Sequence, residues 1–143
     1  MITYFDTSVL LKLFVDDELG NDAVERLWIE SEHIVCAEIG YAEARAALAS
    51  AHRNGRLHMT ALRTSKAQLD DAWQQITVVL VATPVVYAAG DLAESEGLRG
   101  YDAVHLAAAI AAQATVFATA DLRLMEAAQR QGLGVSNPLQ TPD

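Results

Sequence analysis

The chain has 143 residues, a hydrophobic fraction of 52% and a net charge of −9 from 19 acidic and 10 basic residues. This length suffices for one domain with its own core, and the composition excludes a disordered chain. Apolar runs stay below the roughly 18 to 20 residues of a membrane span, and the N-terminus lacks a signal-peptide pattern. Cys36 is the one cysteine, which excludes an internal disulfide and a cysteine-based zinc site. We therefore expect a single cytoplasmic domain over residues 1–143, with no membrane association.

The charge is unevenly distributed along the chain. No Asp or Glu occurs between Ala44 and Leu69, although this segment contains half of all the basic residues. The net acidity argues against binding of nucleic acid by bulk charge, whereas a local basic segment can hold phosphates. An ordinary solvated helical hairpin is the alternative. The candidate phosphate-positioning residues are Arg45, Arg53, Arg56, Arg63 and Lys66.

The first half of the chain begins with a predicted strand, because residues 2–5 are β-branched and aromatic. The strand ends at Asp6, and Thr7 or Ser8 is expected to cap the short apolar helix at 9–15. A charged break at 16–20 follows. The next predicted elements are a helix capped by Asn21, a strand at 33–37, an alanine-rich helix at about 38–54 closed by Gly55, and a helix capped by Thr60.

The second half begins with Thr77–Ala82, which is apolar throughout and predicts a central parallel strand covered on both faces. Thr83 then precedes Pro84, as an N-cap precedes proline at the first helical position. Strands and helices alternate, so the predicted fold class is α/β with a mostly parallel sheet. The remaining predicted elements are a helix to about 96, a helix at 103–113, a strand at 115–118, a helix from 121 to about 132, a short edge strand at 133–136 and an irregular tail with Pro138 and Pro142.

Four acidic residues stand where the carboxyl-terminal edge of such a sheet could collect them. Asp6 ends the first strand and Glu43 lies in the alanine-rich helix. Asp102 begins a helix after a glycine turn, and Asp121 follows the fourth strand. Clustered carboxylates repel one another and favour a hard divalent ion, which can activate water and stabilise charge on a phosphate. Each acid also has a structural alternative, since Asp often caps helices and a lone Glu is usually solvated.

The segments around these acids resemble the successive motifs of PIN-domain ribonucleases, and most closely the VapC toxins of bacterial toxin–antitoxin pairs. The resemblance covers nearly the whole chain in the family's order, and its first and third motifs are the more specific. It implies a three-layer α/β/α fold with a central, mostly parallel sheet of four to five strands. The resembling segments are Tyr4–Leu10 with Lys12, Tyr41–Leu48, Leu98–Ala107 and Ala118–Asp121.

The resemblance also implies a function, namely endonucleolytic cleavage of RNA by metal-activated water. Mg²⁺ or Mn²⁺ would be the cofactor, and Ser8 and Thr119 would place hydroxyl groups near the metal site. The implied partners are an RNA substrate, a cognate antitoxin docked near Leu48, Leu57, Met59 and Leu62, and a second copy of the chain. The implied metal-binding and catalytic residues are Asp6, Glu43, Asp102 and Asp121.

Two other functions compete with this interpretation. A non-catalytic PIN-fold module could bind RNA or protein, and the motifs alone do not exclude it. A receiver-like signalling domain is disfavoured, because no lysine follows the strand at 115–118. His105, three residues after Asp102, is expected to pack beside the site and not to bind the metal. Cys36 is expected to be a small buried apolar residue, and Lys12 either offsets local negative charge or is solvated.

Overall fold

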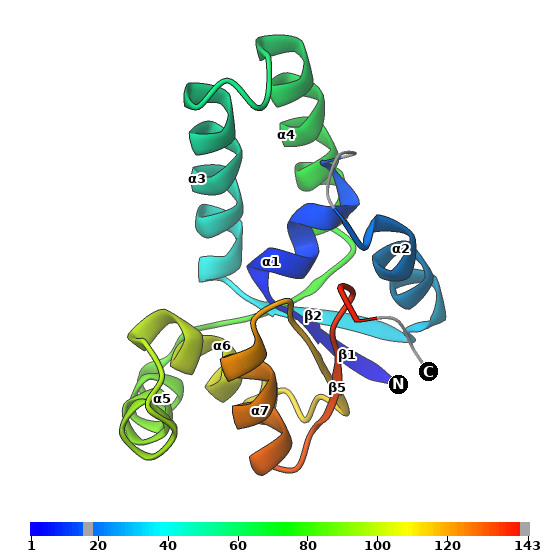
Figure 1. The fold of residues 1–143 in the computed structure, drawn as a ribbon. Helices are drawn as coiled ribbons and strands as arrows, with labels where there is room; N and C mark the ends of the chain where they lie inside the picture. The colour runs from blue at the N-terminus through cyan, green and yellow to red at the C-terminus, as the bar shows by residue number, and fades with distance from the viewer. Residues whose placement is uncertain (16–18, 141–143) are drawn as a thin grey trace.

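The structure is a computed structural model that describes residues 1–15 and 19–140. A five-stranded, all-parallel sheet forms its centre, with the strand order β3-β2-β1-β4-β5 (Figure 1). β1 (Ile2–Phe5) lies in the middle, between β2 (His33–Ala37) and β4 (Val116–Ala118). β3 (Thr77–Val79) and β5 (Gly134–Ser136) form the two edges. The expected α/β class with a parallel sheet is confirmed.

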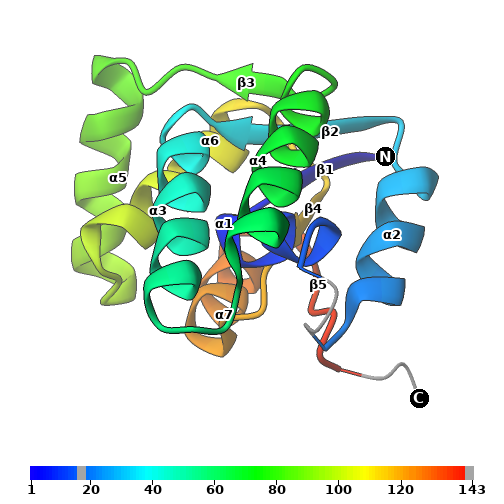
Figure 2. The ribbon, with the colours of Figure 1, turned by 90° about the horizontal axis from the view of Figure 1, so that it is seen from above.

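Helices cover both faces of this sheet and complete the expected three layers (Figures 1 and 2). The first face carries α1 (Thr7–Leu10), the 3-10 turn η1 (Leu11–Leu13), α2 (Asn21–Glu30), α3 (Ile39–Arg53) and α4 (Met59–Trp73). The second face carries α5 (Thr83–Glu96), α6 (Gly100–Ala111) and α7 (Leu122–Arg130). None of the described helices is long and apolar enough to cross a membrane.

The hydrophobic core divides into two clusters because successive strand side chains point to opposite faces. On β1, Tyr4 packs toward α5, α6 and α7, whereas Phe5 packs toward α1, α3 and α4. Both side chains are fully buried, and the Tyr4 ring stacks on Phe117 with centroids 5.1 Å apart. Cys36 is fully buried in the second cluster, as expected. Each large side chain removed from water contributes roughly 1.5–3 kcal/mol.

The prediction that residues 77–82 form the central strand is wrong. β3 ends at Val79 and lies at the edge of the sheet, while Leu80 is 67% exposed. Both faces of the segment are nevertheless covered, because Val78 packs with one core cluster and Val79 with the other. The apolar pattern therefore correctly predicted that both faces of this strand are buried. Burial of both faces does not tell an edge strand from a central one.

Four helix starts differ from the predictions. The cap of α2 is Gly20, and Asn21, which was predicted to cap this helix, is its first residue. The cap of α1 is Asp6, whose carboxylate accepts from the Val9 amide, and not Thr7 or Ser8. The cap of α4 is the exposed His58, which accepts from the Ala61 amide, and not Thr60. The cap of α5 is Ala82, so its helix begins one residue earlier than predicted. Asp6 and His58 each supply a side-chain acceptor to a free amide of the first turn, whereas Ala82 makes no side-chain cap hydrogen bond.

Two further boundaries matter for the site. α6 begins at Gly100, so Asp102 lies in its first turn and does not cap it. The predicted helix at 9–15 is shorter and divides into α1 and η1. The segment 16–18 of the charged break and the last three residues, including Pro142, lie outside the described part of the chain.

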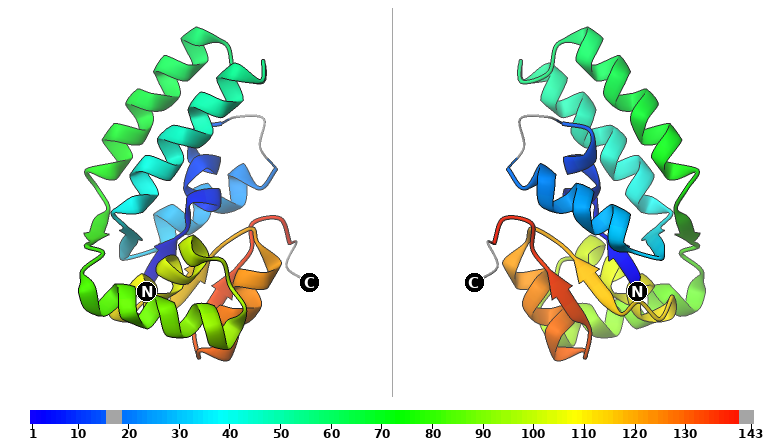
Figure 3. Two further views of the ribbon diagram at one scale, coloured as in Figure 1. Left: turned by 90° about the vertical axis from the view of Figure 1, so that its left-hand side faces the viewer. Right: turned by 90° about the vertical axis from the view of Figure 1, so that its right-hand side faces the viewer.

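α3 and α4 form an antiparallel hairpin that projects from the sheet (Figure 3). Tyr41 of α3 packs its ring on Trp73 of α4, and its hydroxyl donates to Oδ1 of Asp70 at 2.6 Å. The hairpin begins at the carboxyl end of β2, so its base lies beside the sheet and its tip lies far from it. This geometry separates residues early in α3 from those at the α3–α4 turn.

Candidate functional site

Asp6 stands at the carboxyl end of the central strand and is 5% exposed. Its Oδ1 accepts from the Ser8 hydroxyl at 2.6 Å and from the Val9 amide at 3.2 Å. Its Oδ2 accepts from the Thr119 hydroxyl at 2.5 Å. Burial raises the pKa of the Asp6 carboxyl, although these hydrogen bonds and the nearby His105 oppose the shift. Burial therefore makes the ionised Asp6 carboxylate energetically unfavourable unless a cation binds beside it.

Thr119 and Ser8 connect Asp6 to the end of β4. The Thr119 hydroxyl accepts from the amide of Asp121 at 3.0 Å, and the Ser8 hydroxyl accepts from the amide of Ala120 at 3.2 Å. Asp121 caps α7, since its Oδ1 accepts from the amides of Arg123 and Leu124. The capping alternative for Asp121 is therefore present in the fold, and its Oδ2 accepts no hydrogen bond from the described residues.

Glu43 lies one turn into α3 and faces both α1 and α6. Its Oε1 accepts from the Thr7 hydroxyl at 3.1 Å and from Nε2 of His105 at 2.5 Å. Partial burial raises the pKa of the Glu43 carboxyl, but the contacts to His105 and Thr7 outweigh burial and leave the pKa below its usual value. Glu43 is thus held in place and is not a freely solvated helix residue.

Asp102 lies on α6, one turn before His105. Its Oδ2 accepts from Nε of Arg99 at 3.2 Å, and its side chain is 21% exposed against 82% for Arg99. An ion pair with so exposed an arginine contributes little to stability and opens at low cost. Among the four candidate acids, Asp102 is therefore the one held least firmly.

These contacts link three of the four acids, Asp6, Glu43 and Asp121, at the carboxyl edge of the sheet, whereas the hydrogen bond of Asp102 goes to Arg99. Thr119 bridges Asp6 to Asp121, and Thr7, the next residue after Asp6, bridges to Glu43. With the side chains in this arrangement, no three His, Cys, Asp or Glu side chains among residues 1–15 and 19–140 are close enough to hold a metal ion. The carboxylate and hydroxyl oxygens of the network are nevertheless the donors a hard cation prefers, and no thiolate competes.

Sequence reasoning missed the part that Tyr4 plays in this network. The Tyr4 hydroxyl lies 2.6 Å from Nδ1 of His105 and accepts from the Ala37 amide at 3.0 Å. Burial raises the pKa of Tyr4 well above its ordinary value. His105, 3% exposed, packs beside the site as expected. The sequence offered only a weak signal, a tyrosine hydroxyl in a short strand that also contains Thr3.

The basic segment is spread over the α3–α4 hairpin. Arg45 is half-buried and donates to the Tyr41 hydroxyl at 2.9 Å within α3, and the same hydroxyl donates to Asp70 of α4. Arg53 stands ten residues after Glu43, or about 15 Å along a helix axis. The exposed basic residues, which form the basic rim of the hairpin, are Arg53, Arg56, Arg63 and Lys66.

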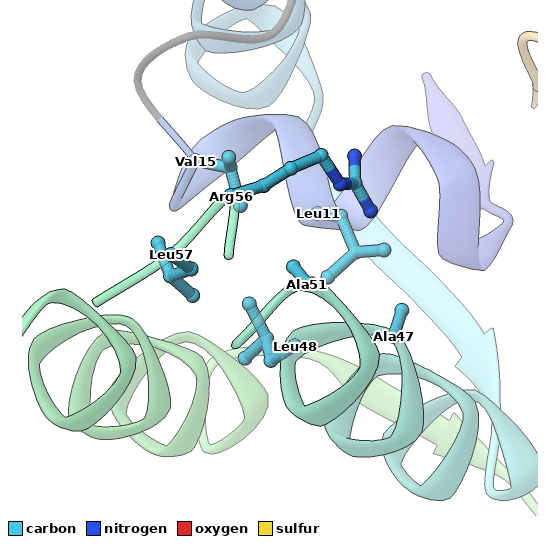
Figure 4. Close-up of a pocket in the computed structure, with 7 residues that line it drawn as sticks. All are labelled: Leu11, Val15, Ala47, Leu48, Ala51, Arg56 and Leu57. Carbon is cyan, nitrogen blue, oxygen red and sulfur yellow. The ribbon is translucent and has the colours of Figure 1, made fainter. Parts of the chain in front are cut away.

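A groove runs between η1 and the α3–α4 hairpin (Figure 4). Its lining is apolar except for Arg56, which reaches into it from the α3–α4 turn. Two of the four residues proposed from the resemblance to face an antitoxin, Leu48 and Leu57, lie in this lining. The lining residues are Leu11, Val15, Ala47, Leu48, Ala51, Arg56 and Leu57.

Comparison with known proteins identifies the family. The PIN domain model matches residues 3–130. The chain is 36% identical over 137 residues to "Ribonuclease VapC45" of Mycobacterium tuberculosis, a match that covers 94% of both chains. The structure superposes on the Mycobacterium tuberculosis "Sarcin-Ricin loop cleaving toxin" VapC20 with a TM-score of 0.69 at 16% identity, covering 92% of this chain and 95% of the other. A "Toxin-antitoxin complex from Klebsiella pneumoniae" gives a TM-score of 0.66 at 16% identity, with 95% and 97% covered. The chain is therefore a PIN-domain protein that belongs to the VapC ribonuclease family.

Proposed function

We propose that this chain is the toxin of a toxin–antitoxin pair and cleaves RNA internally with Mg²⁺ or Mn²⁺ as its cofactor. The observation that carries the proposal is the hydrogen-bonded network that links Asp6, Glu43 and Asp121 at one edge of the sheet. Asp102 lies in the first turn of α6, outside this network. None of the four acids is replaced, so nothing in the motifs favours the non-catalytic alternative.

The residues that would hold the ion are the four acids. Oε2 of Glu43, Oδ1 of Asp102 and Oδ2 of Asp121 accept no hydrogen bond from the described residues and are available as ligands. A bound divalent ion lowers the pKa of water and neutralises charge on a phosphate. Ser8 and Thr119 would keep the Asp6 carboxylate oriented. Arg99, once released by Asp102, would be free to contact a substrate phosphate.

Metal dependence is the direct test of this proposal. The purified protein should cleave structured RNA with Mg²⁺ or Mn²⁺ and stop when EDTA is added. Asp6→Asn and Asp102→Asn should each lower the rate by at least about 100-fold, since several kcal/mol of metal-derived stabilisation are lost. Asp91→Asn, on the exposed face of α5, is the matched control and should cleave normally. Cleavage that survives in both site variants would remove the enzyme proposal.

The basic rim of the hairpin is proposed to position RNA phosphates. Replacing both Arg53 and Arg56 by Glu should weaken binding of a single-stranded RNA and flatten its salt dependence. Each lost phosphate contact reduces the slope of log K against log salt by about 0.7, so a decrease of up to about 1.4 is expected. Fluorescence anisotropy over a salt series measures it, with the inactive Asp102→Asn background preventing cleavage.

The matched control is Arg26→Glu, an exposed reversal on α2 outside the basic segment. It changes the net charge in the same direction without touching the hairpin. A specific role for the hairpin would be contradicted by either of two results. The slope of log K against log salt could stay unchanged in the Arg53 and Arg56 variant, or the Arg26 variant could lose as much RNA affinity per reversed charge.

The groove of Figure 4 supports the expected antitoxin partner, because an apolar lining with a single cation suits a peptide that carries apolar and acidic side chains. The homodimer expected from the resemblance stays a prediction. Leu80, Val86 and Tyr87 expose apolar surface beside and on α5, which a second copy could cover. A toxin that cleaves cellular RNA would act in the cytoplasm.

A further inference from the structure

A buried chain of hydrogen bonds leads from β2 to Glu43. The Ala37 amide donates to the Tyr4 hydroxyl at 3.0 Å, and this hydroxyl lies 2.6 Å from Nδ1 of His105. Nε2 of the same ring lies 2.5 Å from Oε1 of Glu43. Tyr4 is fully buried and His105 is 3% exposed, whereas the Glu43 side chain is 33% exposed. The chain therefore runs from the core to the surface of the site.

The partners of this chain determine where its protons lie. The oxygen of Tyr4 accepts from the Ala37 amide, so its own proton needs an acceptor, as buried hydroxyls generally have one. Nδ1 of His105, which lies 2.6 Å from the hydroxyl oxygen, is the acceptor that the geometry offers. With Nδ1 accepting, the ring proton resides on Nε2 and is donated to Glu43.

We infer that Tyr4 and His105 form a positioning relay in which the Tyr4 hydroxyl fixes the ring of His105 so that its Nε2–H holds Oε1 of Glu43 and leaves Oε2 for the metal ion. This inference rests on the proposed function, since it takes Glu43 as a metal ligand. Neither Tyr4 nor His105 contacts the ion or the RNA. They act through Glu43, whose long side chain is otherwise held, among the described residues, by the Thr7 hydroxyl alone.

The stacking of the relay residues supports this role. The Tyr4 ring is stacked on Phe117 and meets the His105 ring edge to face, with centroids 5.7 Å apart. Tyr4 belongs to the central strand and His105 to α6, so the relay is fixed by the two elements that also carry Asp6 and Asp102. Groups that orient a metal-binding carboxylate typically change metal affinity by 10- to 100-fold when they are removed.

Mn²⁺ binding to the full chain, measured by isothermal titration calorimetry, tests the relay. Tyr4→Phe and His105→Leu should each weaken binding by about 10-fold or more. The matched control is Thr3→Val, which removes another buried hydroxyl from β1, one that pairs with Ser31 and lies outside the relay. Its affinity for Mn²⁺ should equal that of the wild type.

His105→Gln supplies a rescue that a purely structural role would not give. The glutamine amide can donate to Glu43 without the help of Tyr4, so this variant should retain more Mn²⁺ affinity than His105→Leu. Adding Tyr4→Phe to His105→Gln should then cause no further loss. In the metal-free wild type, ¹⁵N spectra of the His105 ring should show the proton on Nε2, and Tyr4→Phe should broaden or abolish this tautomer signature.

The outcomes separate the relay from the proposed function. If the wild type binds Mn²⁺, Asp6→Asn does not, and both relay variants bind as tightly as the wild type, the relay is overturned while the metal-dependent function stands. If the wild type binds no Mn²⁺, the metal-dependent function fails and the relay fails with it. Weakened binding in both relay variants, with rescue by His105→Gln and a normal Thr3→Val control, supports the relay.

Discussion

Asp6→Asn will make the metal-free protein more stable at pH 7 although it destroys the proposed activity. Burial raises the pKa of Asp6, so the folded protein holds this proton more tightly than the unfolded chain does. The stability contributed by the protonated group is complete below the unfolded pKa and is lost as pH rises through the folded pKa. Asn is neutral at every pH and avoids this loss. We expect a gain of about 0.5–2 kcal/mol, as found when strained functional groups are replaced.

Thermal unfolding in EDTA measures this effect. For a domain of this size the gain corresponds to a rise of about 2–6 °C in melting temperature at pH 7, shrinking toward acid pH. Asp91→Asn, an exposed change on α5, should show no such pH-dependent gain. Adding Mn²⁺ at 100 times its dissociation constant should stabilise the wild type by about 2.7 kcal/mol and leave Asp6→Asn unchanged. A variant that is less stable than the wild type at pH 7 would refute the expected cost of the buried charge.

Gly40→Ala will destabilise the protein through a single close contact. Gly40 is buried near the start of α3, and an added Cβ would lie 2.5 Å from Sγ of Cys36 and 3.6 Å from the Trp73 ring. Cys36 is fully buried and has little room to move. Overpacking costs about 1–3 kcal/mol, which exceeds the roughly 1 kcal/mol that Ala gains over Gly in a helix. Because Glu43 follows one turn later, a displaced α3 should lower RNA cleavage as well.

Chemical denaturation of a double-mutant cycle isolates this contact. Cys36→Ala removes the sulfur, so Gly40→Ala should cost about 1–2 kcal/mol less in that background than in the wild type. Gly90→Ala is the matched control, since an added Cβ on α5 meets nothing within 4 Å. It should be neutral or stabilising. If the changes in unfolding free energy of Cys36→Ala and Gly40→Ala are strictly additive, the contact with the sulfur is not what destabilises Gly40→Ala.

The predictions from sequence succeeded for features that neighbouring residues determine, such as the alternation of strands and helices. Alternating strands and helices imply a parallel sheet, and acids at strand ends then fall on one edge of it. The caps of α4 and α5 were predicted wrongly. Whether His58 and Ala82 become the caps depends on the direction from which the chain enters each helix, which the local sequence does not determine. The prediction for Thr77–Ala82 failed similarly, since edge and central strands share one apolar pattern when helices cover both faces.

The sequence by itself determined the fold class and the family motifs, and it singled out the four acids as candidate ligands. Only the tertiary structure decided how these acids are held. Tyr4 and His105 are 101 positions apart, and Asp6 and Thr119 are 113 apart, so no periodicity or spacing could pair them. Such contacts follow from strand order and helix packing. β1 lies beside β4, and α6 packs on the face of the sheet that carries Tyr4 and Phe117. The chemical identity of the site is local, whereas its geometry is a property of the whole sheet.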